Sequence, residues 1–412
     1  MKQKHILQPK LRFPEFDGDW KKSKLNKFAE INPKVPSIPD VFIYIDLESV
    51  INGRLIAENI INKENAPSRA IRTLSKNDIL FQTVRPYQKN NLLFNIDSNN
   101  YVASTGYAQI RTSNNSQFLY QYLHIDDFNK RVLLRCTGTS YPAINSGDLG
   151  EIDITFPSLP EQQKIADYLS TIDAKISLLE EKKTELSRYK KAMMQQLFSQ
   201  QIRFKPVLSG VEGDEKGNDF PEWESFQLKD ILFEHKEKNK SNKYTEVVSV
   251  AKEKGVINQI EHLGRSYSAE NIEHYKVVNP FDVVYTKSPT SGFPFGIIKQ
   301  NKLNRSAVLS PLYAVFKPKT IYLGMLLHDL FLSEVETFNY LVPLVQKGAK
   351  NTMNINNEDF LNGKKYKLPT SEKEQQKIAD FLSAIDESIE KVNEQITQTQ
   401  SFKKAMLQQM FV

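Results

Sequence analysis

The chain has 412 residues, with 55 Lys and Arg against 49 Asp and Glu, which gives a formal net charge of +6. This length allows two or three domains, and the modest positive charge gives only weak support for a nucleic-acid partner. The one cysteine, Cys136, excludes an intramolecular disulfide and fits a reducing compartment. No run approaches the roughly 18 apolar residues of a membrane span, and the first residues lack the apolar core of a signal peptide, so we expect a cytoplasmic protein.

The first 157 residues are predicted to form a globular domain of mixed α and β structure. Short runs rich in β-branched and aromatic residues, at 41–45 and 78–84, indicate strands. A helix is expected around 117–135. The domain should close with a loop, a short helix that begins at Ser146 or Asp148, and a strand that leads into a long helix.

Residues 158–200 are predicted to form this long helix, and residues 370–412 a second one, because one stretch of 38 residues occurs twice. Residues 161–198 and 374–411 align without a gap and share 21 identical residues. Neither copy contains Gly or Pro, so nothing in them should interrupt a helix. At about 1.5 Å per residue, each helix would be roughly 57 Å long.

Between the two helices we expect a linker at 201–219, which is polar and rich in Gly, and a second globular domain at 220–369. Strand-like runs recur at 245–251, 282–286, 295–299 and 312–316, and a helix is expected at 321–339. The segments that frame the two domains echo one another: residues 220–223 resemble 13–16, and 348–360 resemble 138–149. The interiors show no clear similarity. Similar framing segments around dissimilar domain interiors favour a protein whose two domains recognise different targets.

Apolar residues in both long helices recur at alternating steps of four and three, as in a coiled coil. A seam of this length must be covered, and we expect the two helices to cover each other. Two ordinary core helices in unrelated domains are the alternative. The predicted helix-pair core consists of Ile165, Leu169, Ile172, Ile176, Leu179, Leu186 and Met193 in the first helix, and Ile378, Leu382, Ile385, Ile389, Val392, Ile396 and Met406 in the second, with Lys183, Lys190, Thr399 and Lys403 in polar slots.

Catalytic motifs are missing from the sequence. It has no phosphate-binding loop ending in Gly-Lys-Ser/Thr, no Gly-x-Gly-x-x-Gly after a strand and no Gly-x-Ser-x-Gly. The six histidines lack metal-ligand spacing, and no cysteine accompanies them, so no metal site is predicted. Asn279-Pro280-Phe281 partly resembles the Asn-Pro-Pro-aromatic loop of DNA amino-methyltransferases, but we interpret it as a turn before a strand.

Basic, polar and aromatic residues gather instead in predicted loops of both domains. Arg and Lys neutralise phosphates, Arg can also grip guanine, Asn pairs with adenine, and Ser and Thr hold phosphate oxygens. The alternative for each residue alone is a solvated loop. The candidate DNA contacts are Arg69, Arg72, Arg85, Tyr87, Lys89, Thr139, Ser140 and Tyr141 in the first domain, and Arg265, Lys287, Ser288, Thr290, Arg305, Lys350 and Asn351 in the second.

The repeated Glu-Gln-Gln-Lys-Ile-Ala-Asp openings of the long helices, with Leu11-Arg12-Phe13-Pro14-Glu15-Phe16, carry a resemblance to a known family. The chain resembles the specificity subunit of a type I DNA restriction–modification system. This resemblance implies an α+β fold in which two target-recognition domains are separated by two long antiparallel helices that form a coiled coil, as a pseudo-twofold internal repeat. It also implies that each domain reads half of a bipartite DNA target and that the helices fix the gap.

The resemblance further implies a non-catalytic subunit with no cofactor of its own. Its partners would be double-stranded DNA, two modification subunits that methylate adenine, and restriction subunits; S-adenosylmethionine, ATP and Mg would bind to those partners, and no membrane is involved. Two alternatives come from other classes of protein. One is a coiled-coil scaffold that binds proteins and no DNA, and the other is a self-contained enzyme with an unrecognised site.

Overall fold

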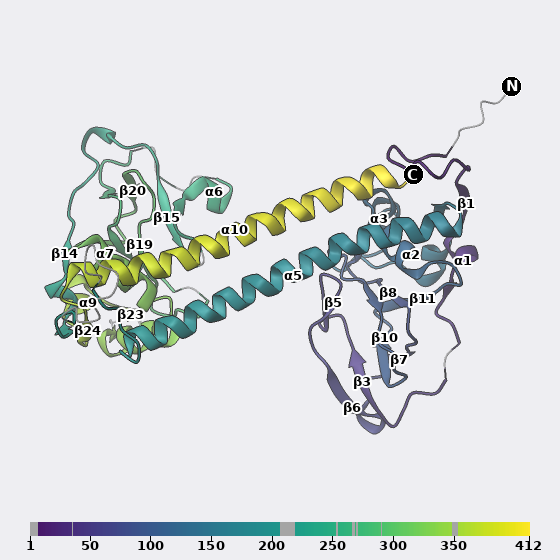
Figure 1. Ribbon diagram of the computed structural model, residues 1–412, viewed down its shortest axis with the longest axis horizontal. Helices are drawn as coiled ribbons and strands as arrows, with labels where there is room; N and C mark the ends of the chain where they lie inside the picture. The colour runs from purple at the N-terminus through teal and green to yellow at the C-terminus, as the bar shows by residue number, and fades with distance from the viewer. Residues whose placement is uncertain are drawn as a thin grey trace, which may run out of the picture. The chain divides into compact units, whose positions relative to one another are not determined.

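The computed structural model describes residues 7–34, 36–206, 219–252, 254–265, 268, 271–289, 291–347 and 353–412. It divides into two compact units, Met1–Lys182 with Val392–Val412, and Lys183–Lys391. Each unit holds one mixed α/β domain together with part of α5 (Leu159–Phe198) and part of α10 (Glu372–Met410), the two long helices of Figure 1. The repeat seen in the sequence therefore corresponds to two units of the same plan.

In the first unit, two four-stranded sheets have the strand orders β6-β3-β10-β7 and β2-β11-β8-β9, and β1 pairs antiparallel with β12 beside the long helices. Strands β3 and β10 are parallel, whereas the other pairs are antiparallel. The elements are β1 Lys21–Lys24, α1 Leu25–Phe28, β2 Glu30–Ile31, β3 Val41–Ile45, β4 Val50–Ile51, β5 Arg54–Leu55, β6 Asn59–Asn62, β7 Ala70–Thr73, β8 Asp78–Gln82, β9 Leu92–Phe94, β10 Tyr101–Ser104, β11 Tyr107–Arg111, α2 Ser116–Tyr122, α3 Asp126–Leu133, α4 Ser146–Gly150 and β12 Asp153–Phe156.

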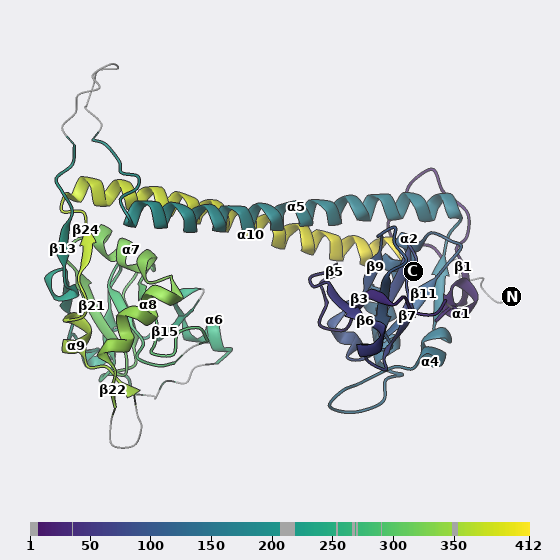
Figure 2. The ribbon, with the colours of Figure 1, turned by 90° about the horizontal axis from the view of Figure 1, so that it is seen from below.

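In the second unit, one four-stranded sheet has the order β14-β21-β18-β19, and β13 pairs with β24 as β1 does with β12. Figure 2 shows α7 and α8 beside β21. The elements are β13 Glu224–Phe226, β14 Leu232–Glu234, β15 Val248–Ala251, β16 Gly255–Asn258, α6 Gln259–Leu263, β17 Lys276–Val278, β18 Val283–Tyr285, β19 Ile298–Gln300, β20 Ala307–Leu309, β21 Ala314–Pro318, α7 Ile321–Leu330, α8 Glu334–Leu341, β22 Gln346–Lys347, β23 Met353–Asn354, α9 Asn357–Leu361 and β24 Tyr366–Leu368.

The two long helices run antiparallel within each unit. In the first unit, Lys403 near the end of α10 pairs with Asp173 near the start of α5, at 2.6 Å. In the second unit, Lys190 near the end of α5 pairs with Asp386 near the start of α10, at 2.7 Å. All fourteen residues of the expected helix-pair core are buried or half-buried. The apolar seam and its polar slots therefore face protein in both units.

The end of α10 completes the core of the first domain. The ring of Phe411 packs against Trp20, Phe118 and Tyr122, with centroids 5.3–6.3 Å apart. The Thr155 hydroxyl donates to the backbone carbonyl of Val412 at 2.9 Å. Aromatic groups of this size bury large apolar areas, so this helix end stabilises a domain that lies far from it in the sequence.

The expectation of a single helix at 117–135 and another at 321–339 is wrong, because each segment forms two helices. Asn129, on α3, donates its side-chain amide to the carbonyl of Leu123, where α2 ends. In the second domain, the Thr337 hydroxyl donates to the carbonyl of Phe331, where α7 ends. A buried polar side chain thus satisfies a helix-end carbonyl that a continuous helix would have bonded itself.

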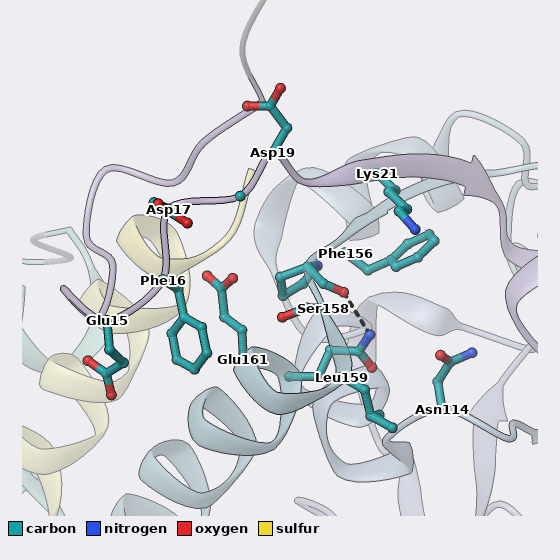
Figure 3. Close-up of a pocket in the computed structure, with 13 residues that line it drawn as sticks. Glu15, Phe16, Asp17, Asp19, Lys21, Asn114, Phe156, Ser158, Leu159 and Glu161 are labelled. Carbon is teal, nitrogen blue, oxygen red and sulfur yellow. Dashed lines mark hydrogen bonds between the residues drawn. The ribbon is translucent and has the colours of Figure 1, made fainter.

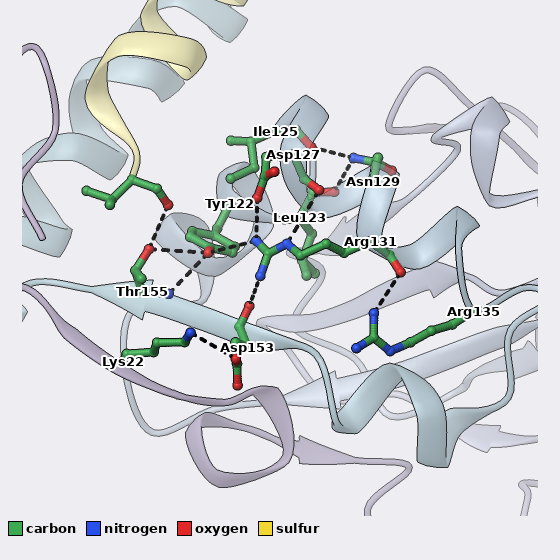
Figure 4. A network of polar contacts seen from close by, with 11 residues as sticks. Lys22, Tyr122, Leu123, Ile125, Asp127, Asn129, Arg131, Arg135, Asp153 and Thr155 are labelled. Carbon is green, nitrogen blue, oxygen red and sulfur yellow. Dashed lines mark hydrogen bonds and ion pairs between the residues drawn. The ribbon is translucent and has the colours of Figure 1, made fainter. Parts of the chain in front are cut away.

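Polar contacts join α2 and α3 to the strand that leads into α5 (Figure 4). The Tyr122 hydroxyl accepts a hydrogen bond from the backbone N–H of Thr155 at 3.1 Å. The Arg131 guanidinium donates to the Asp153 carbonyl and pairs with Asp127 at 3.0 Å. The Tyr122–Thr155 bond is buried, and together with the contacts of Arg131 it joins the two helices to β12.

Candidate nucleic-acid interface

A buried carboxylate joins the first domain to α5. Glu161 accepts two hydrogen bonds from the Arg12 guanidinium, both at 2.8 Å, and one from the Trp20 indole at 3.2 Å. Figure 3 shows it beneath the loop that carries Phe16 and Asp17, in a pocket of about 420 Å³. The hydrogen bonds to Glu161 raise the pKa of Arg12, so the guanidinium stays charged.

The second domain is joined to α10 by the same three groups. Glu374 accepts hydrogen bonds from Arg203 at 2.8 and 3.0 Å and from the Trp223 indole at 3.1 Å. The glutamine that follows each glutamate also makes the same contact in both units. The side-chain amide of Gln162 donates to the carbonyl of Pro157, and that of Gln375 donates to the carbonyl of Pro369. The repeated Glu-Gln pair therefore fixes the joint between domain and helix.

A lysine in a polar slot of the seam is linked to a domain in each unit, directly in the second unit and through an aspartate of α5 in the first. Lys190 bonds Asp386 of α10 and also Asp329 of α7, at 2.8 Å. Lys403 bonds Asp173 of α5, which in turn accepts from Gln121 of α2 at 2.7 Å. The two networks share a plan, but the second unit has a carboxylate where the first has an amide.

Backbone hydrogen bonds gather several candidate loops of the first domain at one end. The backbone N–H of Thr105 donates to the carbonyl of Arg69. The backbone N–H of Thr83 donates to the carbonyl of Gly106, the residue after Thr105. Arg85 donates to the carbonyl of Pro142 at 2.7 Å. The loops around residues 69, 85 and 141, far apart in the sequence, therefore lie together.

Known proteins resemble this chain in sequence. Residues 17–188 match the sequence model of the family described as "Type I restriction modification DNA specificity domain". A "Type I restriction enzyme HindI specificity subunit" from Haemophilus influenzae is 27% identical over 199 residues. The alignment covers 46% of this chain and 42% of that subunit, so the chain spans less than half of this relative's length. Residues 17–188 therefore belong to the family of type I restriction–modification DNA specificity domains.

Solved structures of this family share the fold. The "Type-I restriction-modification system S subunit from M. genitalium" has a TM-score of 0.57 at 12% identity, over 98% of this chain and 99% of that one. A chain in the structure described as "Structural basis underlying complex assembly and conformational transition of the type I R-M system" has a TM-score of 0.51 at 20% identity, over 94% and 96%. At these identities the likeness concerns the fold alone.

The structure separates the candidate contacts of the first domain into exposed and paired groups. Tyr87, Thr139, Ser140 and Tyr141 are exposed, as is Arg69. The Arg85 guanidinium lies 4.1 Å from the centre of the Tyr141 ring, and Arg72 is half-buried, so that burial lowers its pKa. Lys89 pairs with Asp126 at 2.9 Å and also donates to the carbonyl of His124. Its charge is therefore already neutralised.

The candidates of the second domain are more scattered. Lys287 is half-buried, and Ser288 and Arg265 are exposed. Arg305 donates two hydrogen bonds to the Glu246 carboxylate, at 2.6 and 2.7 Å. Thr290, Lys350 and Asn351 lie outside the described residues, so the structure does not place them.

Reasoning from the sequence missed the domain–helix joints. Arg203 and Phe204 fall in the segment expected to be a linker, yet they take the places of Arg12 and Phe13: Phe13 packs on Tyr168 of α5 and Phe204 on Phe381 of α10. The signal was the repeat of Leu11-Arg12-Phe13 as Ile202-Arg203-Phe204. No helix among the described residues could span a membrane, and no acidic, His or Cys cluster there could hold a metal.

Lys299, on β19, is a buried lysine with no hydrogen-bonding partner among the described residues. Lys299 is only 1% exposed. Its burial, together with the positive charge of Lys302, lowers the pKa of its ammonium group to about 8. Below pH 8 the folded chain must keep this charge buried, which costs stability. Above pH 8 the folded chain releases the proton, whereas the unfolded lysine keeps its proton up to about pH 10.4, so the cost fades as pH rises.

Replacing Lys299 with Met should therefore raise stability at pH 7 by about 1–3 kcal/mol, with a smaller gain at pH 10. Thermal unfolding of the full chain at both pH values measures this. Lys229→Met, at an exposed site, serves as the control and should change little. An equal gain at both pH values would contradict the explanation by charge burial.

Proposed function

We propose that the chain is the DNA-reading subunit of a type I restriction–modification complex, with each domain reading one half of a bipartite target. The observation that carries this proposal is the combination of identical joints with different domains: both domains meet the long helices through the same Arg, Trp and Glu, while their loops differ. The match of residues 17–188 to a DNA specificity domain supports the same function. A scaffold without DNA binding would not need unpaired basic groups such as Arg85.

The proposal includes the partners expected of such a subunit. Two modification subunits would carry S-adenosylmethionine and methylate adenine, and restriction subunits would bind ATP and Mg, in the cytoplasm. This chain would contribute recognition and no catalysis.

DNA binding by the full chain, measured by filter binding over a series of salt concentrations, tests the function. A DNA reader neutralises phosphates, so its affinity should fall steeply as salt rises. Mapping of N6-methyladenine in cells that carry the chain with its modification subunits should give one bipartite motif. Binding that is absent at low salt would favour a protein scaffold, and methylation by the purified chain alone would favour a self-contained enzyme.

Lengthening the helix pair should change the gap between the half-sites. The two inter-helix ion pairs place Glu181 and Lys182 of α5 opposite Glu394 and Gln395 of α10. Seven residues would be inserted in each helix, between Glu181 and Lys182 in α5 and between Glu394 and Gln395 in α10. This insertion lengthens the helix pair by about 10 Å, or about three base pairs of DNA. Methylation mapping should then show a longer gap and unchanged half-sites.

The control for this insertion replaces the seven residues before each insertion point with a different heptad of equal length and pattern, which should leave the gap as it was. Altered half-sites, or an unchanged gap in a folded variant, would count against the helices as a spacer.

A further inference from the structure

The two domains place a basic residue in the same backbone conformation after equivalent strands. Strands β8 and β18 both follow a turn closed by an aspartate: Asp78 accepts from the backbone N–H of Ser75, and Asp282 from that of Asn279, each at 2.8 Å. Soon after each strand comes a basic residue with positive φ, Arg85 at 54° and Lys287 at 56°.

Left-handed backbone is unfavourable for long side chains, because Cβ crowds the carbonyl oxygen; Gly and Asn are the usual residues there. The surroundings hold both residues in place. The backbone N–H of Arg85 donates to the carbonyl of Pro142. Gly296 approaches Lys287 so closely that a Cβ at Gly296 would lie 2.9 Å from the backbone nitrogen of Lys287. Strain of this kind persists mainly at sites where function requires it.

Neither cation has a hydrogen-bonding or ionic partner among the described residues. The Arg85 Nε is buried and unpaired, while its guanidinium stacks on Tyr141, which is 63% exposed. Lys287 is half-buried, and burial, helped by Lys276, lowers its pKa. Lys89 differs: it has the same left-handed backbone, at φ 55°, but pairs with Asp126. Leaving a partly buried cation unpaired costs stability, and a ligand with acceptor atoms would remove that cost.

We propose that Arg85 and Lys287 are the specificity-determining residues of the two half-sites, each donating to the O6 and N7 atoms of a guanine in the major groove. These two acceptors are the usual target of Arg and Lys among base edges. Tyr141 acts as a positioning residue, since its ring holds the guanidinium plane. This inference rests on the proposed DNA-reading function and assigns one reading residue to each domain.

The test compares Arg85→Asn and Lys287→Asn with the unmodified full chain in selection of bound duplexes from a random-sequence library. Asn tolerates left-handed backbone, so the fold should persist. Each variant should lose guanine preference at one position of one half-site, by roughly 5- to 100-fold, and keep the other half-site. Because strain and an unpaired cation are removed, the melting temperature should stay the same or rise by about 1–4 °C.

Lys89→Asn is the matched control. Lys89 lies in the same loop as Arg85 and also has left-handed backbone, but its charge is paired with Asp126. It should lower the melting temperature and leave base preference unchanged. Arg85→Lys should retain part of the affinity and part of the guanine preference, because a lysine can also donate to O6 and N7. Tyr141→Leu should weaken the guanine preference of the first half-site without affecting the second half-site.

A uniform loss of affinity across all sequences would overturn the inference, since it would make the residues phosphate contacts. A fall in melting temperature with unchanged base preference would also overturn it, in favour of a structural role. If the unmodified chain selects no sequence at all, the proposed function fails; if it selects one and the Asn variants select the same one, only this inference fails.

Discussion

Replacing Arg203 with Ala should destabilise the second unit by about 3–5 kcal/mol, because the carboxylate of Glu374 would remain buried without its cation. Glu374 is fully buried, and among the described residues only the Trp223 indole would still donate to it. Arg12→Ala should have the same effect in the first unit, where Glu161 is almost as deeply buried. Thermal unfolding should show a fall in melting temperature of roughly 6–20 °C.

Two comparisons make this expectation specific. Adding Glu374→Gln to Arg203→Ala removes the stranded charge and should recover part of the loss. The deficit of Arg203→Ala alone should shrink at acidic pH, because an unpaired buried carboxyl has a raised pKa and takes up a proton as pH falls. Arg188→Ala, which removes only an exposed ion pair on α5, should change stability little. A small effect of Arg203→Ala at neutral pH would show that the joint does not depend on this pair.

Replacing Lys190 with Met should cost about 3–5 kcal/mol, whereas the equivalent change at Lys403 should cost only about 1–2 kcal/mol. Burial opposes the charge on Lys190, but the carboxylates of Asp329 and Asp386 outweigh it and raise its pKa. Without the lysine, Asp329, whose side chain is 6% exposed, would be left with a buried charge. In the first unit the corresponding group is the neutral Gln121, and Asp173 is 37% exposed, so less is lost.

Denaturation of Lys190→Met and Lys403→Met, measured side by side, checks this difference. Because both lysines occupy the same position of the repeat, each serves as the control for the other. Lys190→Met combined with Asp329→Leu should be more stable than Lys190→Met alone, since an apolar pair avoids the stranded charge. Equal losses in the two units would mean that the burial of Asp329 has no part in the effect.

The sequence contained enough information for the long helices and the two-domain plan. Apolar residues at steps of four and three, such as Ile165, Leu169 and Ile172, can be recognised without any tertiary structure, because the helix itself sets the period. The strand at Val41–Ile45 was expected with its observed bounds for a similar reason, since its residues favour extended backbone.

The breaks and the pairing of charges could not be predicted in this way. The apolar pattern continues through the α2–α3 break, which depends on the side chain of Asn129 turning back to Leu123. Whether a basic loop residue is available for DNA depends on distant partners: Glu246 lies 59 positions from Arg305, and Asp126 lies 37 from Lys89. Arg85 and Lys89 look alike in sequence, and only tertiary contacts distinguish them.

The packing of Phe411 in the first domain has a consequence for how the chain acquires its structure during translation. The ribosome makes the rings of Trp20 and Phe118 early, but the aromatic group that covers them emerges only after the entire second unit. Part of the apolar surface of the nascent first domain therefore stays exposed until Phe411 has been synthesised. Contacts between residues that are hundreds of positions apart also form slowly. Pausing or premature release of the polypeptide would consequently harm the domain that was synthesised first.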